Sequence, residues 1–182
     1  AMSSTRGALA DLEKVLQYGF SDKGLLELAL THSSLKQSKT DPSYERLEFL
    51  GDRVLGLVIA ELLLEQFPKS AEGKLAPRLA ALVSGTTLAD VARSVGLGGY
   101  IRMTDGEAGA GTNARKSVLA DCCEAVIGAL YIDGGLDAAG GFIRRVWTPL
   151  IRDVEPRVAK TELQEWLQGR GLPLPEYSIV ER

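Results

Sequence analysis

The stretch Glu45-Arg46-Leu47-Glu48-Phe49-Leu50-Gly51-Asp52 decides how this chain folds and what chemistry it can carry. Its acids are spaced by three and four residues, so on an α-helix Glu45, Glu48 and Asp52 fall within a stripe roughly 60° wide. Like charges crowded on one face are unfavourable unless a cation lies among them, and hard oxygen ligands suit Mg²⁺. The stretch therefore predicts a helix with a metal site on one face.

The helix that carries these acids is expected over 44–66, because Pro68 follows it. From 54 to 64 it is apolar almost all round apart from Glu61, which is typical of a central, buried helix. Apolar residues continue its acidic face, namely Leu55, Ile59, Leu62 and Leu63. The acids therefore do not belong to an ordinary solvated stripe.

A second acidic pair, Asp121 and Glu124, lies three residues apart in another predicted helix, 117–132, which is otherwise nearly uncharged until Asp133. Burying one unpaired carboxylate costs roughly several kcal/mol. Two apolar helices that each carry such groups are therefore expected to share a positively charged partner. Metal ions held between the two helices would satisfy that demand.

Each cluster also has a simpler interpretation. Acids in the first turns of an exposed helix interact favourably with the helix dipole, and Glu45 and Glu48 could pair with Arg46 or Arg53 at the surface. The second acidic pair could equally form surface ion pairs. The occurrence of both clusters on apolar helices favours the metal interpretation.

Composition limits the classes of protein. The chain has 182 residues, 45% hydrophobic and 25% charged, which fits one globular domain with a modest appendage. No run reaches the roughly 18 apolar residues of a membrane span, and no signal-peptide pattern opens the chain, so we expect a cytoplasmic protein with no membrane partner. The net charge of −3 argues against nucleic acid, but bound divalent cations would offset it.

Helical periodicity extends along the rest of the chain, and an all-α fold is expected. The further predicted helices are 9–16 with Gly19 as its stop, 23–31 capped by Ser21 or Asp22, 75–83, 87–95 and 136–154. Cys122 and Cys123 are adjacent, which disfavours both a disulfide and zinc ligation, so they are expected to be reduced and buried.

Several segments together resemble bacterial ribonuclease III, the Mg²⁺-dependent endonuclease of double-stranded RNA. They occur in the family's order and are Leu28-Ala29-Leu30-Thr31-His32-Ser33-Ser34, the acidic stretch 45–52, Glu72-Gly73-Lys74-Leu75, Leu119-Ala120-Asp121, and Glu124-Ala125-Val126-Ile127-Gly128. The resemblance implies an all-α ribonuclease III catalytic domain over 7–156.

The resemblance also implies roles for individual acids. The metal ligands would be Glu48, Asp52, Asp121 and Glu124; the catalytic set would be Asp52 and Glu124 with Glu45 and Glu72 as auxiliaries. The cofactor would be Mg²⁺, with Mn²⁺ as a substitute. Metal-activated water would hydrolyse the RNA backbone to 5′-phosphate and 3′-hydroxyl ends, in the processing of rRNA precursors and other structured transcripts.

Partners follow from the same resemblance. Family members pair two nuclease domains, which implies a homodimer in which Phe49 inserts into the partner subunit, whereas the alternative is an ordinary core phenylalanine. Arg115 and Lys116 are candidates for contacting RNA phosphates, against the alternative of simple solubilising charge.

Residues 157–182 resemble the first helix and first strand of an α/β double-stranded-RNA-binding domain. In this segment Thr161, Gln164 and Glu165 match the positions that face the RNA groove. The chain stops at Arg182, before the remaining strands and the basic second helix, so the segment is expected to be an incomplete domain.

Other features qualify this interpretation. Ala76-Pro77 stands where the family has a serine and basic residues; proline in a first helical turn is tolerated, but RNA contacts from that helix are in doubt. The lone histidine, His32, is expected to be a structural group satisfied by the backbone or by a neighbouring serine. The glycine-rich stretch 106–116 lacks the ending of a nucleotide-binding loop, so no nucleotide cofactor is expected.

Two other functions compete with an active nuclease. A catalytically silent protein that binds double-stranded RNA on the same fold would have no need for the acids. An all-helical nucleotide pyrophosphohydrolase also uses acidic pairs on helices, but the tail that resembles an RNA-binding domain argues against it.

Overall fold

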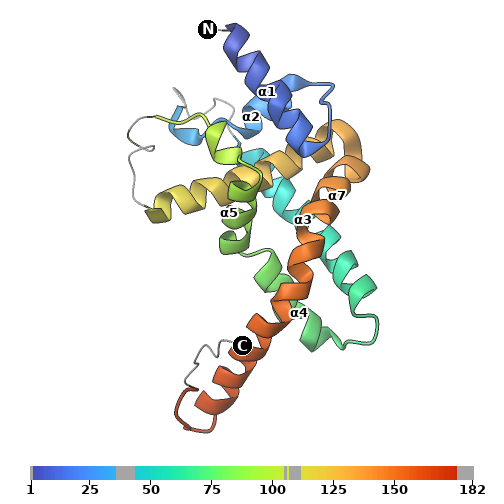
Figure 1. Cartoon of the computed structure of the whole chain (residues 1–182), viewed down its shortest axis with the longest axis vertical. Coiled ribbons are helices and arrows are strands. Elements are labelled where there is room, and N and C mark those ends of the chain that lie inside the picture. The colour runs from blue at the N-terminus through green and yellow to red at the C-terminus, as the bar shows by residue number, and fades with distance from the viewer. Residues whose placement is uncertain (1, 36–43, 105, 107–111, 176–182) are drawn as a thin grey trace, which may run out of the picture.

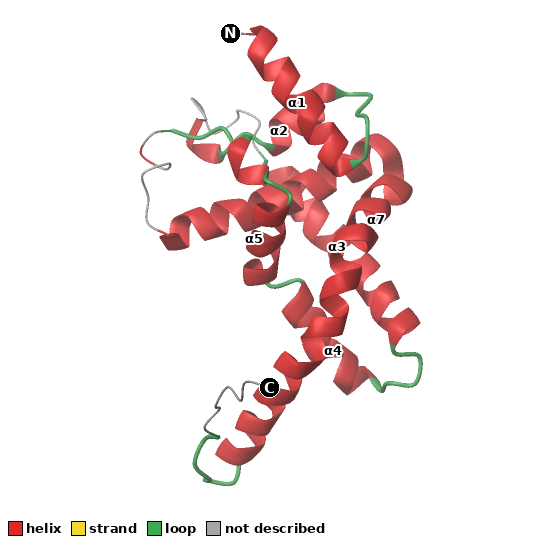
Figure 2. Cartoon of the chain, viewed as in Figure 1, coloured by secondary structure: helices red, strands yellow, loops and turns green. Residues whose placement is uncertain are grey.

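The structure is a computed structural model that describes residues 2–35, 44–104, 106 and 112–175 (Figure 1), without the side chains at 2–8, 112–114, 153–162 and 165. Its elements are α1 (Met2–Leu16), α2 (Lys23–Ala29), the 3₁₀ turn η1 (Ser33–Leu35), α3 (Glu45–Gln66), α4 (Glu72–Leu82), α5 (Gly85–Ser94), the 3₁₀ turn η2 (Leu97–Gly99) and α7 (Thr112–Gln168). Figure 2 shows helices and loops but no strand, and within the described residues the only extended pairing is an isolated parallel bridge between Thr31 and Arg102. The predicted all-α fold is confirmed.

The centre of the fold is the packing of α3 against α7, the most extensive contact between two elements. The apolar continuation of the acidic face is buried as predicted, with Leu55 and Ile59 at 0% exposure. The prediction that α3 is buried all round is wrong on one side, because Leu57 and Leu64 are 52% and 59% exposed. One face of α3 therefore forms the core and another faces outward.

Helix α7 contains both predicted C-terminal helices. They meet at Gly135, whose φ of 68° and ψ of −166° are not helical and suit a residue without a Cβ. Before this break, Ala125 to Leu130 are buried at the centre of the fold. Among the described residues, Arg115–Arg152 is by length and composition apolar enough to cross a membrane. Half of its apolar 18-residue stretch is buried, and the core helix of a soluble protein has the same character.

Helix α1 ends differently from the prediction. Gln17, not Gly19, takes the left-handed conformation, with φ of 55°. The N–H of Gln17 donates to the carbonyl of Lys14 at 3.2 Å, and that of Tyr18 to Glu13 at 3.1 Å, which is the Schellman pattern of helix termination. The predicted cap of α2 is confirmed, because the Asp22 carboxylate accepts the N–H of Gly24 at 2.8 Å.

Helix α4 corrects the expectation for Pro77. The helix begins at Glu72, three residues earlier than predicted, so Pro77 lies in its second turn and not its first. Proline there removes the bond to the carbonyl four residues earlier, which belongs to the exposed Gly73. Solvent can satisfy that carbonyl, so the helix continues through the proline.

The cysteines are free and buried, as predicted. Cys123 is 0% exposed, and the Cys122 thiol donates to the carbonyl of Ala29 at 3.4 Å. Burial, the largest cause, raises the pKa of the Cys122 thiol to about 12. Both side chains therefore act as small apolar core groups.

At the C-terminal end, α7 continues through 156–157 to Gln168, so the proposed domain limits at that point remain a prediction. This part of α7 projects away from the rest of the fold in Figure 1. Leu163 and Trp166 are 43% and 52% exposed, and the guanidinium of Arg170 lies 4.0 Å from the Trp166 ring. Residues 171–175 form no strand, and the rest of the predicted first strand lies outside the described residues.

Candidate metal centre

Two glycines allow α3 and α7 to touch at the level of the acids. A Cβ on Gly51 would lie 1.8 Å from the carbonyl oxygen of Glu124, and a Cβ on Gly128 would lie 2.2 Å from that of Leu47. Any larger residue would push the backbones apart, so both positions need glycine for close approach. The reciprocal contact places one turn of acids on α3 directly beside the acids of α7.

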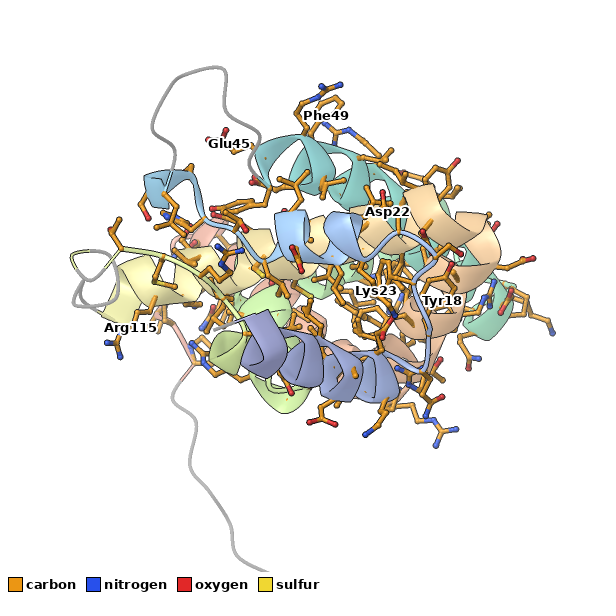
Figure 3. All side chains as sticks on the ribbon, turned by 90° about the horizontal axis from the view of Figure 1, so that it is seen from above. Tyr18, Asp22, Lys23, Glu45, Phe49 and Arg115 are labelled. Carbon is orange, nitrogen blue, oxygen red and sulfur yellow. The ribbon has the colours of Figure 1, made fainter. Side chains whose placement is uncertain are left out.

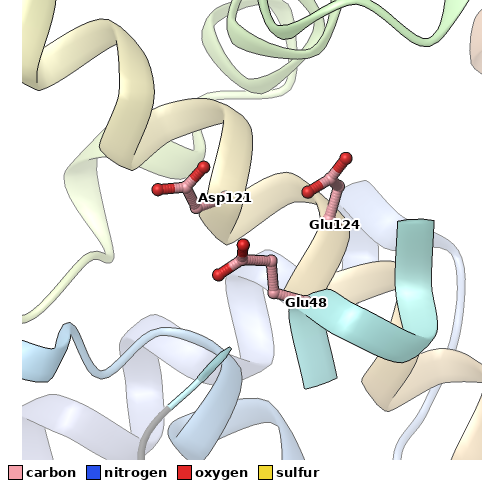
Figure 4. Close-up of side chains that lie close together, drawn as sticks. All are labelled: Glu48, Asp121 and Glu124. Atoms are coloured by element: carbon pink, nitrogen blue, oxygen red, sulfur yellow. The ribbon is translucent and has the colours of Figure 1, made fainter. Parts of the chain in front are cut away.

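Three carboxylates meet at this crossing. Each of Glu48, Asp121 and Glu124 offers an oxygen, and these atoms all lie within 4.8 Å of one another. Figure 4 shows Glu48 reaching from α3 toward the two acids of α7. All three side chains are half-buried. Three carboxylate oxygens with open solvent on one side are a donor set that suits Mg²⁺ or Mn²⁺, which keep several water ligands.

The acids of the cluster repel one another strongly. Burial, followed by Asp52, Glu48 and Asp121, raises the pKa of Glu124 to about 8. Burial also raises the pKa of Glu48, with further contributions from Asp121, Glu45 and Asp52. A bound divalent cation would reverse this effect, because it would be the largest local charge and would favour the ionised carboxylates. The electrostatics therefore match a site built for a cation.

The pKa of Asp121 is raised as well, and burial is again the largest cause. Hydrogen bonds from Ser117 and Tyr44 and the charge of His32 oppose this rise in pKa. The Ser117 hydroxyl donates to Asp121 Oδ2 at 3.4 Å, which is long for such a bond. Sequence reasoning missed Tyr44 and Ser117, because no periodicity distinguishes a polar residue that supports a carboxylate from one that faces solvent.

Asp52 lies outside the three-residue cluster. Its carboxylate forms an ion pair with the guanidinium of its neighbour Arg53, whose side chain is 71% exposed. After burial, the charge of Asp52 is nevertheless the largest cause of the raised pKa of Glu124. Its predicted role as a metal ligand remains a prediction.

The auxiliary acids lie further out. Glu45 is exposed in the first turn of α3 and contributes to the raised pKa of Glu48. Glu72 is exposed at the first residue of α4 and does not join the cluster. Both predicted roles stay untested.

His32 behaves as the structural group that was predicted. Its Nδ1 accepts the N–H of Ser34 at 3.1 Å, and its ring centroid lies 5.5 Å from that of Tyr44.

Phe49 projects outward from α3 (Figure 3) and is 70% exposed. The alternative of an ordinary core phenylalanine is therefore wrong for this chain. The guanidinium of Arg53 lies 5.7 Å from the centre of its ring.

The candidate RNA contacts are scattered. Arg115 is exposed near the start of α7 (Figure 3), whereas the Lys116 ammonium donates to the hydroxyl of Thr86 at 2.8 Å and so joins α7 to α5. Gln164 is half-buried in the projecting end of α7, and the side chains of Thr161 and Glu165 lie outside the described residues.

Comparison with known proteins supports one family. Residues 22–150 match the family model described as Ribonuclease-III-like. Ribonuclease 3 of Rhodopseudomonas palustris is 50% identical over 183 residues, covering 99% of this chain and 67% of the relative. Ribonuclease 3 of Nitrobacter winogradskyi is also 50% identical, over 100% of this chain and 70% of the relative.

Solved structures agree. The nuclease domain of ribonuclease III from Campylobacter jejuni superimposes with a TM-score of 0.70 and 43% identity, covering 80% of this chain and 96% of that one. Dicer from Pichia stipitis superimposes with a TM-score of 0.57 and 28% identity, covering 74% of this chain and 58% of that one. The family match and the identity to curated relatives over almost the whole chain mean that this protein belongs to the ribonuclease III family and is an endoribonuclease.

Proposed function

We propose that this protein cuts double-stranded RNA endonucleolytically, in a reaction that depends on Mg²⁺ and leaves 5′-phosphate and 3′-hydroxyl ends. The observation that carries the proposal is the convergence of Glu48, Asp121 and Glu124 at the crossing of two apolar helices. The curated relatives named Ribonuclease 3 support the substrate class.

Glu48, Asp121 and Glu124 would hold the ion, and Asp52 would join them by turning away from Arg53. When bound, Mg²⁺ or Mn²⁺ would make a water molecule easier to deprotonate for attack on the phosphate and would offset the charge that develops there. The chain contributes a frame for these carboxylates, because the missing side chain at Gly51 lets α3 lie directly against the Glu124 carbonyl of α7. Glu45 and Glu72 would act as auxiliaries at the rim.

RNA would lie across the exposed side of this site. Arg115 would contact phosphates, and Lys116 would do so only after release from Thr86. Further contacts would come from the segment 157–182 as the beginning of a double-stranded-RNA-binding domain, through Thr161, Gln164 and Glu165. The exposed Leu163 and Trp166 support this assignment, since such a helix packs one apolar face against the sheet of its own domain.

The active form would be a homodimer. Phe49, Leu57 and Leu64 are all exposed and recur at spacings of eight and seven, which places them within a stripe roughly 80° wide on α3. A row of exposed apolar side chains on one side of a helix supports an interface there. The similar nuclease domain from Campylobacter jejuni is described as having structural flexibility in a region involved in dimer formation. Two sites related by a twofold axis would cut opposite strands.

In the cell we place this activity in the cytoplasm, in the processing of rRNA precursors and other structured transcripts. The presence of every acid that matches the family argues against a catalytically silent RNA-binding protein.

The direct test is incubation with labelled duplex RNA, with and without Mg²⁺. We expect short products only with the ion, no turnover by Glu124→Gln, and unchanged RNA binding by that variant. Glu61→Gln is the matched control, because Glu61 is also half-buried but lies 13 residues beyond Glu48 on α3, roughly 20 Å away along the helix. An intact duplex after exposure to folded protein and Mg²⁺ would contradict the proposal and favour the silent binder.

A further inference from the structure

Tyr44 connects the two helices that carry the acids. It immediately precedes α3, and its carbonyl accepts the N–H of Glu48 at 2.9 Å. Its side chain turns inward and is only 4% exposed, and its hydroxyl forms a hydrogen bond with the carboxylate of Asp121 on α7. One residue therefore contacts an acid of the cluster on each side of the helix crossing.

The ring of His32 packs against the ring of Tyr44. The two ring centroids are 5.5 Å apart, with 39° between the ring planes. His32 is itself held twice: its N–H donates to the carbonyl of Arg102 at 2.9 Å, and its Nδ1 accepts the N–H of Ser34 at 3.1 Å. Both bonds of His32 are to backbone groups, so the imidazole ring has a fixed position against the ring of Tyr44.

The position of the Asp121 carboxylate matters for binding a cation. A carboxylate on a short side chain can rotate, and each rotation changes which oxygen faces the other ligands. Ser117, which is exposed and 3.4 Å away, restrains this rotation weakly. Tyr44 is buried, unlike Ser117, so its hydroxyl can hold one oxygen of Asp121 while the other faces Glu48 and Glu124.

We infer that Tyr44 is a positioning residue of the metal centre, which orients Asp121 through its hydroxyl, and that His32 braces the tyrosine ring. The inference rests on the proposed metal-dependent function. Groups that orient a ligand in this way typically change metal affinity by 10- to 100-fold, roughly, when they are removed.

The test is the affinity of the RNA-free protein for Mn²⁺, measured by titration calorimetry. Tyr44→Phe removes the hydroxyl and keeps the ring. The matched control is Tyr18→Phe, because the Tyr18 hydroxyl donates to Asp133 Oδ2 at 2.8 Å and Asp133 also lies on α7, far from the cluster. We expect Tyr44→Phe to weaken Mn²⁺ binding by roughly tenfold or more and Tyr18→Phe to leave it within about twofold.

Equal affinities of wild type and folded Tyr44→Phe would overturn the inference while leaving the proposed metal function intact. Absence of Mn²⁺ binding by the wild type would overturn the metal function and the inference with it. The two failures are therefore distinguishable.

His32→Ala tests whether His32 supports the tyrosine ring. If Tyr44→Phe does not fold, an unchanged Mn²⁺ affinity in His32→Ala overturns the inference, because a displaced ring would misplace its hydroxyl. We expect His32→Ala to weaken Mn²⁺ binding less than Tyr44→Phe does. We expect the double variant to lose less affinity than the sum of the two single losses, because His32 acts in part through the tyrosine hydroxyl. Additive losses in the double variant, or unchanged affinity in His32→Ala, would overturn the role of His32.

Discussion

Gly51 on α3 lies against the main-chain carbonyl of Glu124 on α7, so closely that a Cβ at position 51 would come within 1.8 Å of that oxygen. The same residue whose side chain belongs to the acidic cluster therefore supplies the backbone contact that sets the distance between the helices. Packing and chemistry therefore depend on one crossing.

Gly51→Ala should destabilise the protein and abolish metal binding. The added methyl group must push α3 away from α7, at a cost of about 1–3 kcal/mol for an overpacked core. The displacement also carries Glu48 away from its partners. Urea denaturation measures the free energy of unfolding, and titration calorimetry measures the affinity for Mn²⁺.

Gly56→Ala is the control for that variant. Gly56 lies on the same helix with nothing within 4 Å of its would-be Cβ, so alanine there should be neutral or stabilise by up to about 1 kcal/mol through helix propensity. If the two substitutions have equal effects, the close crossing does not organise the site.

The stability of the metal-free protein should fall as pH rises. The pKa of Glu124 is raised from 4.5 to about 8, so the folded state binds the proton more tightly than the unfolded state. This contribution to stability is complete below pH 4.5 and is lost as pH rises through about 8. Urea denaturation in EDTA at a series of pH values between these limits measures it.

Glu124→Gln provides the comparison, because the amide does not titrate. The variant should lose less stability than the wild type across the same pH range. Mg²⁺ must displace the proton from Glu124, so its apparent affinity for the wild type should increase with pH. An affinity that stays constant from pH 6 to roughly 8 would show that Glu124 does not ligate the ion.

Phe49→Ala should weaken the proposed homodimer without unfolding the subunit. The side chain is 70% exposed, so little core packing is lost within one subunit, whereas a buried aromatic anchor at an interface often contributes about 2 kcal/mol or more. Analytical ultracentrifugation measures the dimer and circular dichroism the fold. Val15→Ala on α1, which lies on the opposite side of the molecule in Figure 3 and is 41% exposed, should change neither.

Asp133→Asn should loosen the N-terminal helices and leave the metal centre unchanged. The Asp133 carboxylate accepts the Tyr18 hydroxyl at 2.8 Å and the N–H groups of Ser21 and Asp22 at 2.8 and 2.9 Å. The amide can accept fewer of these bonds, so the melting temperature should fall by several degrees, roughly. Asp137→Asn, which changes an exposed acid just beyond the break at Gly135, should melt like the wild type.

The positions of the helices could be predicted because they depend on local periodicity. The span of α3, the cap of α2 at Asp22 and the break near Gly135 each follow from the residue types at that point in the chain. Helix ends were predicted less well, because several neighbouring residues can end or begin a helix at similar free energy. Gln17 takes a left-handed conformation that glycine would adopt more easily, and Pro77 lies a turn deeper in α4 than expected.

By itself, the sequence determined that two apolar helices would each carry acids on one face, because helical spacing is a property of the chain alone. Only the tertiary structure decided which acids meet: Glu48, Asp121 and Glu124 converge, Asp52 pairs with Arg53, and Tyr44 forms a hydrogen bond with Asp121. The physical reason is that the distance between side chains on different helices is set by how closely their backbones pack. Here that packing distance depends on two glycines that carry no functional group.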